Sequence, residues 1–365
     1  MPLRALARVN LAAIERNVAR LRRELSLGAE LCAVVKADGY GHGAAPAARA
    51  ALDGGATWLA VATAEEAASL RAEGVDARVL IMGALSAEEL PVALAANADV
   101  VAWDQRFVDA LAGTPVRVHV KLDTGMGRLG TRSADEALAV ADRVTTTKGL
   151  ELVGAMTHFA TADDDQEFVK RQLSAFEPVA ESLHERHPGI VIHAANSAAT
   201  LKAPASHFDL VRCGIAIYGC DPMNEDPSAR GLEPALELSS YVAAVKHARA
   251  GESVGYGRRF VAESDTWIAT LPIGYADGIR RAFTNNAEVL VGGARYPLVG
   301  TVSMDNITID LGPKPAPQIG DVATLIGAGL TAEELARRIG TINYEIVCGI
   351  SRRVTRSYHR DGIDA

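Results

Sequence analysis

The first two thirds of the chain repeat one pattern, in which a short apolar run is followed by a segment with helical spacing. Most of these runs lack alternating polar residues, as expected for strands covered on both faces in a parallel sheet. The eight runs are residues 32–36, 58–63, 78–83, 98–103, 116–123, 152–159, 189–196 and 209–219. Eight strands alternating with helices predict an α/β fold of the (β/α)8 TIM-type barrel class. A doubly wound open sheet is the competing architecture.

The segments between these runs carry helix signals. Residues 10–25 and 166–186 place Leu, Ala, Glu and Arg at helical spacing. Residues 63–74 begin with a threonine and an acidic first turn and stop at a glycine, as is typical of a capped helix. The acidic run at 162–165 lacks the alternating spacing of a calcium loop, so it predicts a solvated loop or a helix start.

After about residue 230 the pattern changes to apolar stretches separated by Gly, Pro and Asn turns, which are typical of a mostly antiparallel β domain. These stretches are residues 235–248, 265–274, 287–300, 305–312 and 321–327. One short helix is predicted at 331–340, with a threonine cap and two glutamates in its first turn. We therefore expect a barrel over residues 9–230 and a C-terminal β domain over 231–365. The N-terminal residues 1–8 are a candidate extra strand of the second domain.

Composition excludes several classes of function. A chain of 365 residues with 48% hydrophobic residues can bury two sizeable cores. The net charge of −8 argues against a nucleic-acid or anionic-membrane surface, because both favour clustered positive charge. The four cysteines form no CxxC pair, so no metal site is predicted, and they are expected to be buried free thiols, which fit a reducing compartment. With no signal peptide and no membrane-spanning run evident, a cytoplasmic location is expected.

Polar residues cluster at the ends of the predicted barrel strands. Lys36 ends the first run, Lys121 and Asp123 the fifth, His158 the sixth, and Asn196 and Ser197 the seventh, while Arg212 lies within the eighth. The C-terminal ends of barrel strands converge, so these residues predict one site. Each taken alone has an ordinary explanation, since a lysine after a strand usually reaches solvent. The "GYGHG" glycines lack the G-x-G-x-x-G spacing of a dinucleotide loop.

The segment "AVVKADGYGHG" (33–43) resembles the cofactor-attachment segment of the alanine racemases, which are fold-type III pyridoxal-phosphate enzymes. Eight further segments resemble this family in the same order: residues 119–130, 156–163, 193–199, 211–219, 254–260, 272–278, 299–306 and 342–354. The resemblance covers nearly the whole chain. It implies the cofactor pyridoxal 5'-phosphate and an isomerase that interconverts L- and D-alanine to supply peptidoglycan synthesis.

The same resemblance implies two catalytic bases. Lys36 would form the Schiff base with the cofactor aldehyde. Once the substrate amine replaces it in an external aldimine, Lys36 would remove or return the proton on one face of Cα. Tyr256 would serve the other face and would come from the partner subunit of a homodimer. Since an amine attacks only when unprotonated, the pKa of Lys36 must fall below its ordinary value.

The resemblance also implies the residues that bind the cofactor and substrate. The cofactor phosphate would contact Tyr40, Ser197, the N–H groups of Gly214 and Ile215, and Tyr344, and the remaining cofactor contacts would be His158, Asn196 and Arg212. Arg212 would face the pyridine nitrogen, and because arginine only donates, the ring would stay unprotonated, which favours racemisation over transamination. Arg128 would pair with the substrate carboxylate or with the phenolic oxygen of the cofactor. A second-subunit rim of Tyr275, Met304 and Asp305 would limit the size of the substrate. Lys121 matches a lysine that is carbamylated in some members.

Three alternatives stay open on the sequence. A serine or broad-specificity racemase of the same family would differ in the residues of the substrate rim. A non-catalytic pyridoxal-phosphate-binding barrel would resemble the first domain alone, whereas this chain also carries Tyr256, Tyr275 and Met304 in a second domain. A fold-type III decarboxylase is disfavoured by Arg212 at the pyridine position.

Overall fold

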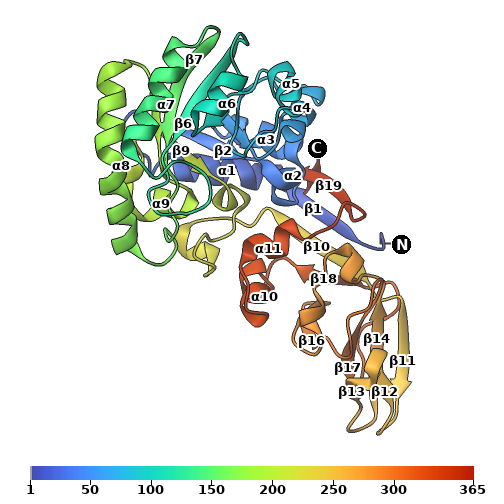
Figure 1. The fold of residues 1–365 in the computed structure, drawn as a ribbon. Helices are drawn as coiled ribbons and strands as arrows, with labels where there is room; N and C mark the ends of the chain where they lie inside the picture. The colour runs from blue at the N-terminus through green and yellow to red at the C-terminus, as the bar shows by residue number, and fades with distance from the viewer. Residues whose placement is uncertain (1) are drawn as a thin grey trace. The chain divides into compact units, whose positions relative to one another are not determined.

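The computed structural model describes residues 2–365 and divides into two compact units (Figure 1). One, here called the barrel unit, comprises Ile14–Tyr40 and Ala44–Ile217. The other, here called the β unit, combines the segment up to Ala13 with Gly41–Gly43 and Tyr218–Ala365. The domain boundary expected at residue 230 stays a prediction.

Eight parallel strands form the barrel unit (Figure 1). They are β2 (Glu30–Val34), β3 (Trp58–Val61), β4 (Arg78–Ile81), β5 (Val100–Ala102), β6 (Val116–Lys121), β7 (Leu150–Met156), β8 (Val191–His193) and β9 (Leu210–Cys213). Two arcs, β4-β3-β2-β9 and β5-β6-β7-β8, are joined by the parallel bridges Leu80↔Asp99 and Asn196↔Arg212. The ring closes, so the predicted (β/α)8 barrel is confirmed and the open doubly wound sheet is excluded.

Helices alternate with the barrel strands, as the pattern predicted. They are α1 (Leu11–Arg22), α3 (Ala44–Asp53), α4 (Ala64–Ala72), α5 (Leu90–Ala95), α6 (Gln105–Ala110), α7 (Ala134–Thr146), α8 (Gln166–Arg186) and α9 (Ser197–Lys202). Thr63 caps α4 in a capping box with Glu66, which confirms the helix start predicted at that threonine. The acidic run at 162–165 ends on the N-cap of α8, where Asp165 accepts the N–H of Phe168 at 3.0 Å.

The largest sheet of the β unit contains the first strand of the chain in its interior. Its strand order is β16-β15-β18-β10-β1-β19-β20. These strands are β1 (Leu6–Asn10), β10 (Leu236–Tyr241), β15 (Glu288–Val291), β16 (Ala294–Pro297), β18 (Val322–Ile326), β19 (Thr355–Arg360) and β20 (Ile363–Asp364). The N-terminal strand β1 pairs antiparallel with β10 and parallel with β19.

Two smaller sheets complete the β unit. One has the order β11-β14-β17, with β11 (Ala244–Ala248), β14 (Thr266–Leu271) and β17 (Ile307–Gly312), and the other pairs β12 (Ser253–Val254) with β13 (Phe260–Val261). Within the described part of this unit, β1 and β19 are the one parallel pair among the named strands. The C-terminal domain is therefore mostly antiparallel, as predicted.

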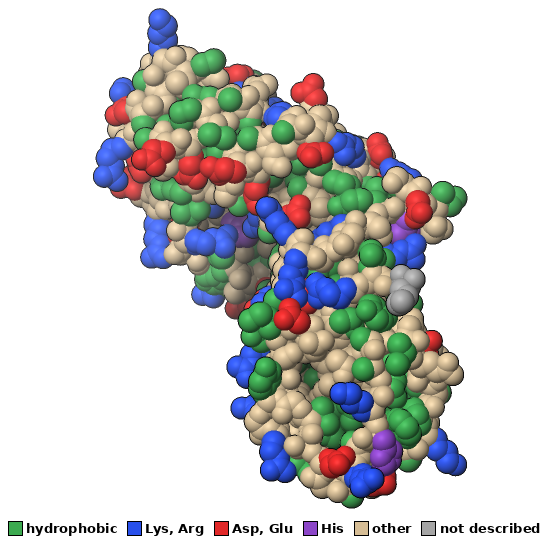
Figure 2. All heavy atoms as spheres, turned by 90° about the vertical axis from the view of Figure 1, so that its right-hand side faces the viewer, with side chains coloured by type: hydrophobic (Ala, Val, Ile, Leu, Met, Phe, Trp, Pro, Cys, Tyr) green, Lys and Arg blue, Asp and Glu red, His purple; other side chains and the backbone are tan. Residues whose placement is uncertain are grey.

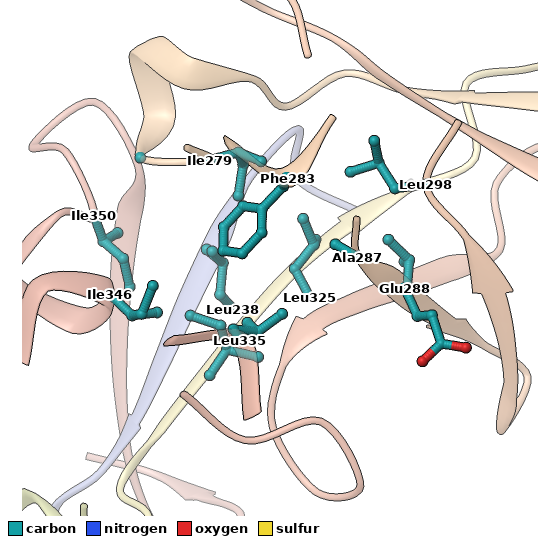
Figure 3. Close-up of a pocket in the computed structure, with 13 residues that line it drawn as sticks. Leu238, Ile279, Phe283, Ala287, Glu288, Leu298, Leu325, Leu335, Ile346 and Ile350 are labelled. Carbon is teal, nitrogen blue, oxygen red and sulfur yellow. The ribbon is translucent and has the colours of Figure 1, made fainter. Parts of the chain in front are cut away.

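Two short helices cover an apolar core in the β unit. They are α10 (Ala332–Arg338), which was predicted, and α11 (Asn343–Cys348), which was not. The start of α11 has no side-chain cap, because its N-cap residue is Ile342, so the sequence carries no start signal there. Figure 3 shows Leu335 of α10 and Ile346 of α11 converging with Phe283, while the carboxylate of Glu288 points away from them.

The burial of the cysteines, the surface charge and the apolar character of the helices can be compared with the expectations from composition. Cys32, Cys213 and Cys220 are buried free thiols and Cys348 is an exposed one, so the expectation of buried thiols is wrong for Cys348. On the face drawn in Figure 2, both acidic and basic side chains are scattered over the surface. No helix among residues 2–365 combines the length and the apolar character that crossing a bilayer requires.

Candidate active site

Lys36 begins a turn that directly follows the first barrel strand. The strand β2 ends at Val34, so Lys36 does not close it, which corrects the sequence-based expectation. In α2 (Lys36–Tyr40), Ala37 and Asp38 have φ/ψ of 52°/48° and 54°/49°, which is left-handed helical geometry. Tyr40 also has a positive φ, of 53°. This geometry costs a residue other than glycine roughly 1–2 kcal/mol, so neighbouring groups must hold the turn.

Two side-chain carboxylates stabilise this turn by accepting hydrogen bonds from backbone N–H groups. An oxygen of Glu66 accepts the N–H of Ala37 at 2.7 Å, and Oδ1 of Asp38 accepts the N–H of Ala44 at 3.0 Å. Glu66 is the same residue that closes the capping box of α4, so one side chain ties a helix start to the residue after Lys36. The backbone that carries the Lys36 amine is therefore restrained on both sides, by a buried strand and by a clamped turn.

Three of the residues predicted to bind the phosphate meet at the start of α9. Ser197 Oγ accepts the N–H of Gly214 at 2.9 Å and that of Ala216 at 3.4 Å. A Cβ at position 214 would lie 2.4 Å from the hydroxyl of Tyr40, so only glycine fits where that hydroxyl packs. Hydroxyls and backbone N–H groups of this kind suit a dianion. Ile215 follows directly and is fully buried.

Arg212 on β9 is the buried centre of the barrel site, with only 2% of its surface exposed. Its Nη2 donates to the carbonyls of Thr157 and Ala194, both at 2.9 Å, and lies 3.1 Å from Nδ1 of His158. Its Nη1 lies 2.9 Å from Nδ1 of His193. Its Nε–H is buried and has no partner among residues 2–365. A buried donor without a partner is costly, so this N–H suits an acceptor on a bound ligand.

Positive charge accumulates around Arg212. Burial and the charges of Arg212 and Arg128 lower the pKa of Lys121 to about 8. Burial and the same cations hold the pKa of His158 well below its ordinary value, so this imidazole is neutral near pH 7. Lys36 contributes to both shifts, which means that its amine lies in the same electrostatic environment. This end of the barrel is therefore suited to ligands with several negative charges.

Asn196 has a structural contact of its own, because its Oδ1 caps α9 by accepting the N–H of Ala199 at 2.9 Å. Tyr344 lies half-buried in α11 of the β unit. The contacts with the cofactor that were expected for Asn196 and Tyr344 stay predictions.

The residues predicted to come from the partner subunit gather on the β unit. Tyr256 begins a 3-10 turn (Tyr256–Arg258) and is 76% exposed. Tyr256, Tyr275, Met304 and Asp305 line one open hollow, together with Arg281, Thr301, Val302, Ser303 and Asn306. An exposed group of large apolar side chains of this kind is typical of an interaction surface.

The walls of this hollow are held by close backbone packing. Tyr275 donates its N–H to the carbonyl of Ser303 at 2.9 Å, and a Cβ at Gly274 would lie 2.3 Å from that same oxygen. Glycine at 274 is therefore required by the approach of the two chain segments.

Sequence reasoning missed an ion-pair network beside this hollow. Arg353 donates to Asp305 and to the buried Asp277, both at 2.6 Å. Burial alone would raise the pKa of Asp277, but hydrogen bonds from Arg4 and Arg353 lower it to about 2. Asp277 and Arg353 lie inside two of the quoted motif segments, so the resemblance had marked their positions without assigning them a role.

Comparison with known proteins identifies the family. The model of the alanine racemase N-terminal domain matches residues 9–222, and that of the alanine racemase C-terminal domain matches residues 235–358. The chain belongs to the alanine racemase family. It is 43% identical to an alanine racemase of Frankia casuarinae over 98% of this chain and 96% of that protein. It is 42% identical to one of Halalkalibacterium halodurans over 97% of this chain and 95% of that protein.

Solved structures of alanine racemases are similar throughout. The enzyme from the D-cycloserine producer Streptomyces lavendulae has a TM-score of 0.92 and 39% identity and covers 98% of each chain. The Bacillus anthracis enzyme with bound L-Ala-P has a TM-score of 0.92 and 37% identity and covers 100% of this chain and 97% of that one. These similarities extend over both units.

Alanine racemases depend on pyridoxal phosphate, and the residues of the barrel unit fit this cofactor. The hydroxyl and N–H groups at the start of α9 suit its phosphate. The unpartnered Nε–H of Arg212 suits an unprotonated ring nitrogen. The cations around Lys121 suit the phenolic oxygen of the cofactor and a substrate carboxylate.

Proposed function

We propose that this member of the alanine racemase family interconverts L- and D-alanine, using Lys36 of one chain and Tyr256 of its partner in a homodimer as the two bases. The observation that carries the proposal is the barrel site itself, in which Lys36 stands on a clamped turn in the same cationic environment as the buried Arg212. The full-length similarity to alanine racemases, one of them with L-Ala-P bound, supports alanine as the substrate.

The proposed mechanism divides the work among residues of this chain. Bound pyridoxal phosphate supplies the electron sink that acidifies the Cα–H bond. Lys36 moves a proton on one face of Cα and Tyr256 on the other, because one base on one side returns the proton to the same face. Arg212 donates to the ring nitrogen and has no acceptor for a ring proton, which favours return of the proton to Cα.

Other residues hold and select the ligands in this proposal. Tyr40, Ser197, Tyr344 and the Gly214 and Ile215 N–H groups bind the phosphate, with further cofactor contacts from His158 and Asn196. Arg128 pairs with the substrate carboxylate or the phenolic oxygen of the cofactor. Tyr275, Met304 and Asp305 limit the size of the substrate side chain.

The exposed hollow of the β unit supports the homodimer. Tyr256 is the most exposed of its aromatic residues, and Tyr275 and Met304 are 43% and 52% exposed. A symmetric dimer uses the same surface on both chains, so covering this hollow on each would complete two sites at once.

The free thiols of all four cysteines support a reducing compartment, and we place the enzyme in the cytoplasm, supplying D-alanine for peptidoglycan.

Incubating the purified protein with L-alanine and pyridoxal phosphate is expected to give D-alanine, measured by chiral chromatography, until the enantiomers are equimolar. Equal amounts are required because enantiomers have equal free energies. L-Serine in a parallel reaction measures breadth of specificity. A protein that binds the cofactor and forms no D-amino acid from either substrate would contradict the proposal and favour a non-catalytic cofactor-binding role.

We also propose that Lys121 is carbamylated. With its pKa near 8, about a tenth of its amine is neutral at pH 7, far more than for an ordinary lysine, and this form can attack carbon dioxide, forming an N–C bond and releasing one proton. The charge changes from positive to negative beside Arg128 and Arg212, both of which oppose the lysine's positive charge.

Carbon-13 bicarbonate is expected to give a carbamate NMR signal at pH 8.5 that weakens towards pH 6, because the neutral amine is lost as pH falls below the pKa of Lys121. Lys121→Arg should remove the signal, whereas the control Lys148→Arg, at an exposed lysine, should retain it. A signal that survives in Lys121→Arg would assign the carbamate to another amine.

A further inference from the structure

A row of buried side chains continues from Arg212 through the barrel interior. Nε2 of His193, at the end of β8, lies 2.9 Å from Nδ1 of His119 on β6. Nε2 of His119 lies 3.2 Å from Oδ2 of Asp99, the residue before β5. His193, His119 and Asp99 are fully buried, and Arg212 is 2% exposed. We call Arg212, His193, His119 and Asp99 the buried row.

With both histidines neutral, one arrangement of protons satisfies every contact in the buried row. Arginine has donors and no acceptor, so Nδ1 of His193 accepts from Arg212 and the proton of His193 is on Nε2. That proton faces Nδ1 of His119, which therefore accepts, so His119 carries its proton on Nε2 and donates it to Asp99. An ionised carboxylate only accepts, so Asp99 imposes the same order from the other end.

The electrostatics agree with this order. Burial lowers the pKa of His119 and holds that of His193 well below its ordinary value, so both rings are neutral near pH 7. Burial alone would raise the pKa of Asp99, but His119 and two arginines lower it. Nε of Arg78 donates to Asp99 at 2.8 Å and Nε of Arg117 at 2.5 Å.

The barrel wall is shaped around the buried row. A Cβ at Gly154 on β7 would lie 1.9 Å from Nδ1 of His119, so any side chain there would displace the ring. The rings of His119 and His193 meet edge to face, with centroids 5.0 Å apart, and Trp58 packs against His119 in the same way at 5.7 Å. His119 is thus held by packing as well as by hydrogen bonds.

Arg212 is a buried cation to which no carboxylate within residues 2–365 is paired. Buried charges usually pair with an opposite charge, and Asp99 is the anion connected to Arg212, through two imidazoles that polarise one another. We propose that Asp99 and His119 are positioning residues that act through His193 on Arg212, holding the guanidinium in the orientation that leaves its Nε–H for the cofactor ring. The proposal rests on the proposed function for the identity of that acceptor, whereas the proton order does not.

Nitrogen-15 NMR of the histidine-labelled wild-type protein tests the proton order directly at pH 7. Two-bond couplings between ring nitrogens and carbon-bound protons distinguish the two neutral tautomers and the cation. His119 and His193 are both expected as the Nε2–H tautomer, with signals assigned from His119→Phe and His193→Phe. An Nδ1–H tautomer or an imidazolium at either position would overturn the proposal. This result is independent of any catalytic activity, so a failed racemase assay and a failed proton order are separate outcomes.

Asp99→Asn tests the action on Arg212. The amide introduces an NH2 donor where Arg78, Arg117 and His119 already direct their N–H groups. The tautomers of His119 and His193 are therefore expected to mix or invert. The kcat for alanine is expected to fall about tenfold or more, with KM changed by no more than about twofold. A loss of this size is typical when a residue that orients a functional side chain is removed, as is known for the residues that orient metal-binding side chains. Unchanged tautomers together with unchanged kcat would overturn the proposal.

The matched control is Asp221→Asn. Asp221 is also a fully buried carboxylate bound by an arginine, Arg230, at 2.8 Å, but it lies in the β unit and touches no histidine of the buried row. It should leave kcat and both tautomers unchanged. If Asp99→Asn fails to fold, His119→Phe breaks the row while leaving Asp99 with Arg78 and Arg117, and it should show the same selective loss of kcat. A wild-type kcat in His119→Phe would equally overturn the proposal.

Discussion

Replacing Lys36 by alanine is expected to lower racemase activity by at least about 10³-fold, because the variant loses both the amine that attaches the cofactor and one of the two bases. The visible absorbance band of lysine-linked pyridoxal phosphate should disappear at the same time. The turn should survive, since Ala37 and Asp38 are held through a backbone N–H and a carboxylate that the substitution leaves in place. Absorbance spectra and the chiral assay check both effects.

The control for this variant is Lys170→Ala, which removes a lysine from the exposed surface of α8. It should keep the absorbance band and wild-type activity, since exposed ion pairs of this kind contribute little to stability. An unchanged band in Lys36→Ala would show that another amine carries the cofactor. Lost activity with a retained band would leave Lys36 a base without an attachment role.

Replacing Tyr256 by phenylalanine is expected to lower racemisation by about 10²- to 10⁴-fold, the usual contribution of a positioned acid–base group. The fall in kcat/KM must be equal in both directions, because the equilibrium constant between enantiomers is one. The asymmetry should appear in exchange of the Cα hydrogen with deuterium oxide. The enantiomer that Lys36 deprotonates should keep exchanging, and the other should stop. Equal, small losses of exchange from both enantiomers would contradict the two-base assignment.

Mixing the two inactive variants tests whether the site is shared. In a hybrid dimer of Lys36→Ala and Tyr256→Phe chains, one site would combine an intact Lys36 with an intact Tyr256 from the other chain. Random exchange of subunits should then restore roughly a quarter of the wild-type sites. If both bases came from one chain, every site would remain defective and mixing would restore nothing. Tyr296→Phe, on β16 of the β unit, is the matched control and should be fully active.

The main course of the fold could be predicted from the sequence because it depends on local patterns. All eight apolar runs of the barrel became strands, and the caps at Thr63 and Thr331 start helices where expected. The short helix α11 was missed because nothing in its sequence caps its start. Lys36 was predicted to end the first strand, but it begins the turn that follows. An apolar run does not reveal that the strand ends at Val34 and that the backbone then becomes left-handed.

The family and the types of residue that the chemistry needs could be read from the chain's residues alone, because nine collinear segments carry them. How these residues are held became visible only in the folded molecule. Glu66 clamps the turn after Lys36, and Arg353 joins Asp277 to Asp305, through contacts between residues distant in the chain. The direction of hydrogen bonding from Arg212 to Asp99 likewise requires buried side chains of three strands, and of the residue before a fourth, to meet in the barrel interior. Such contacts leave no periodic signal in the sequence, because the spacing of residues along a strand reflects only which face of that strand is buried and not which distant residue it contacts.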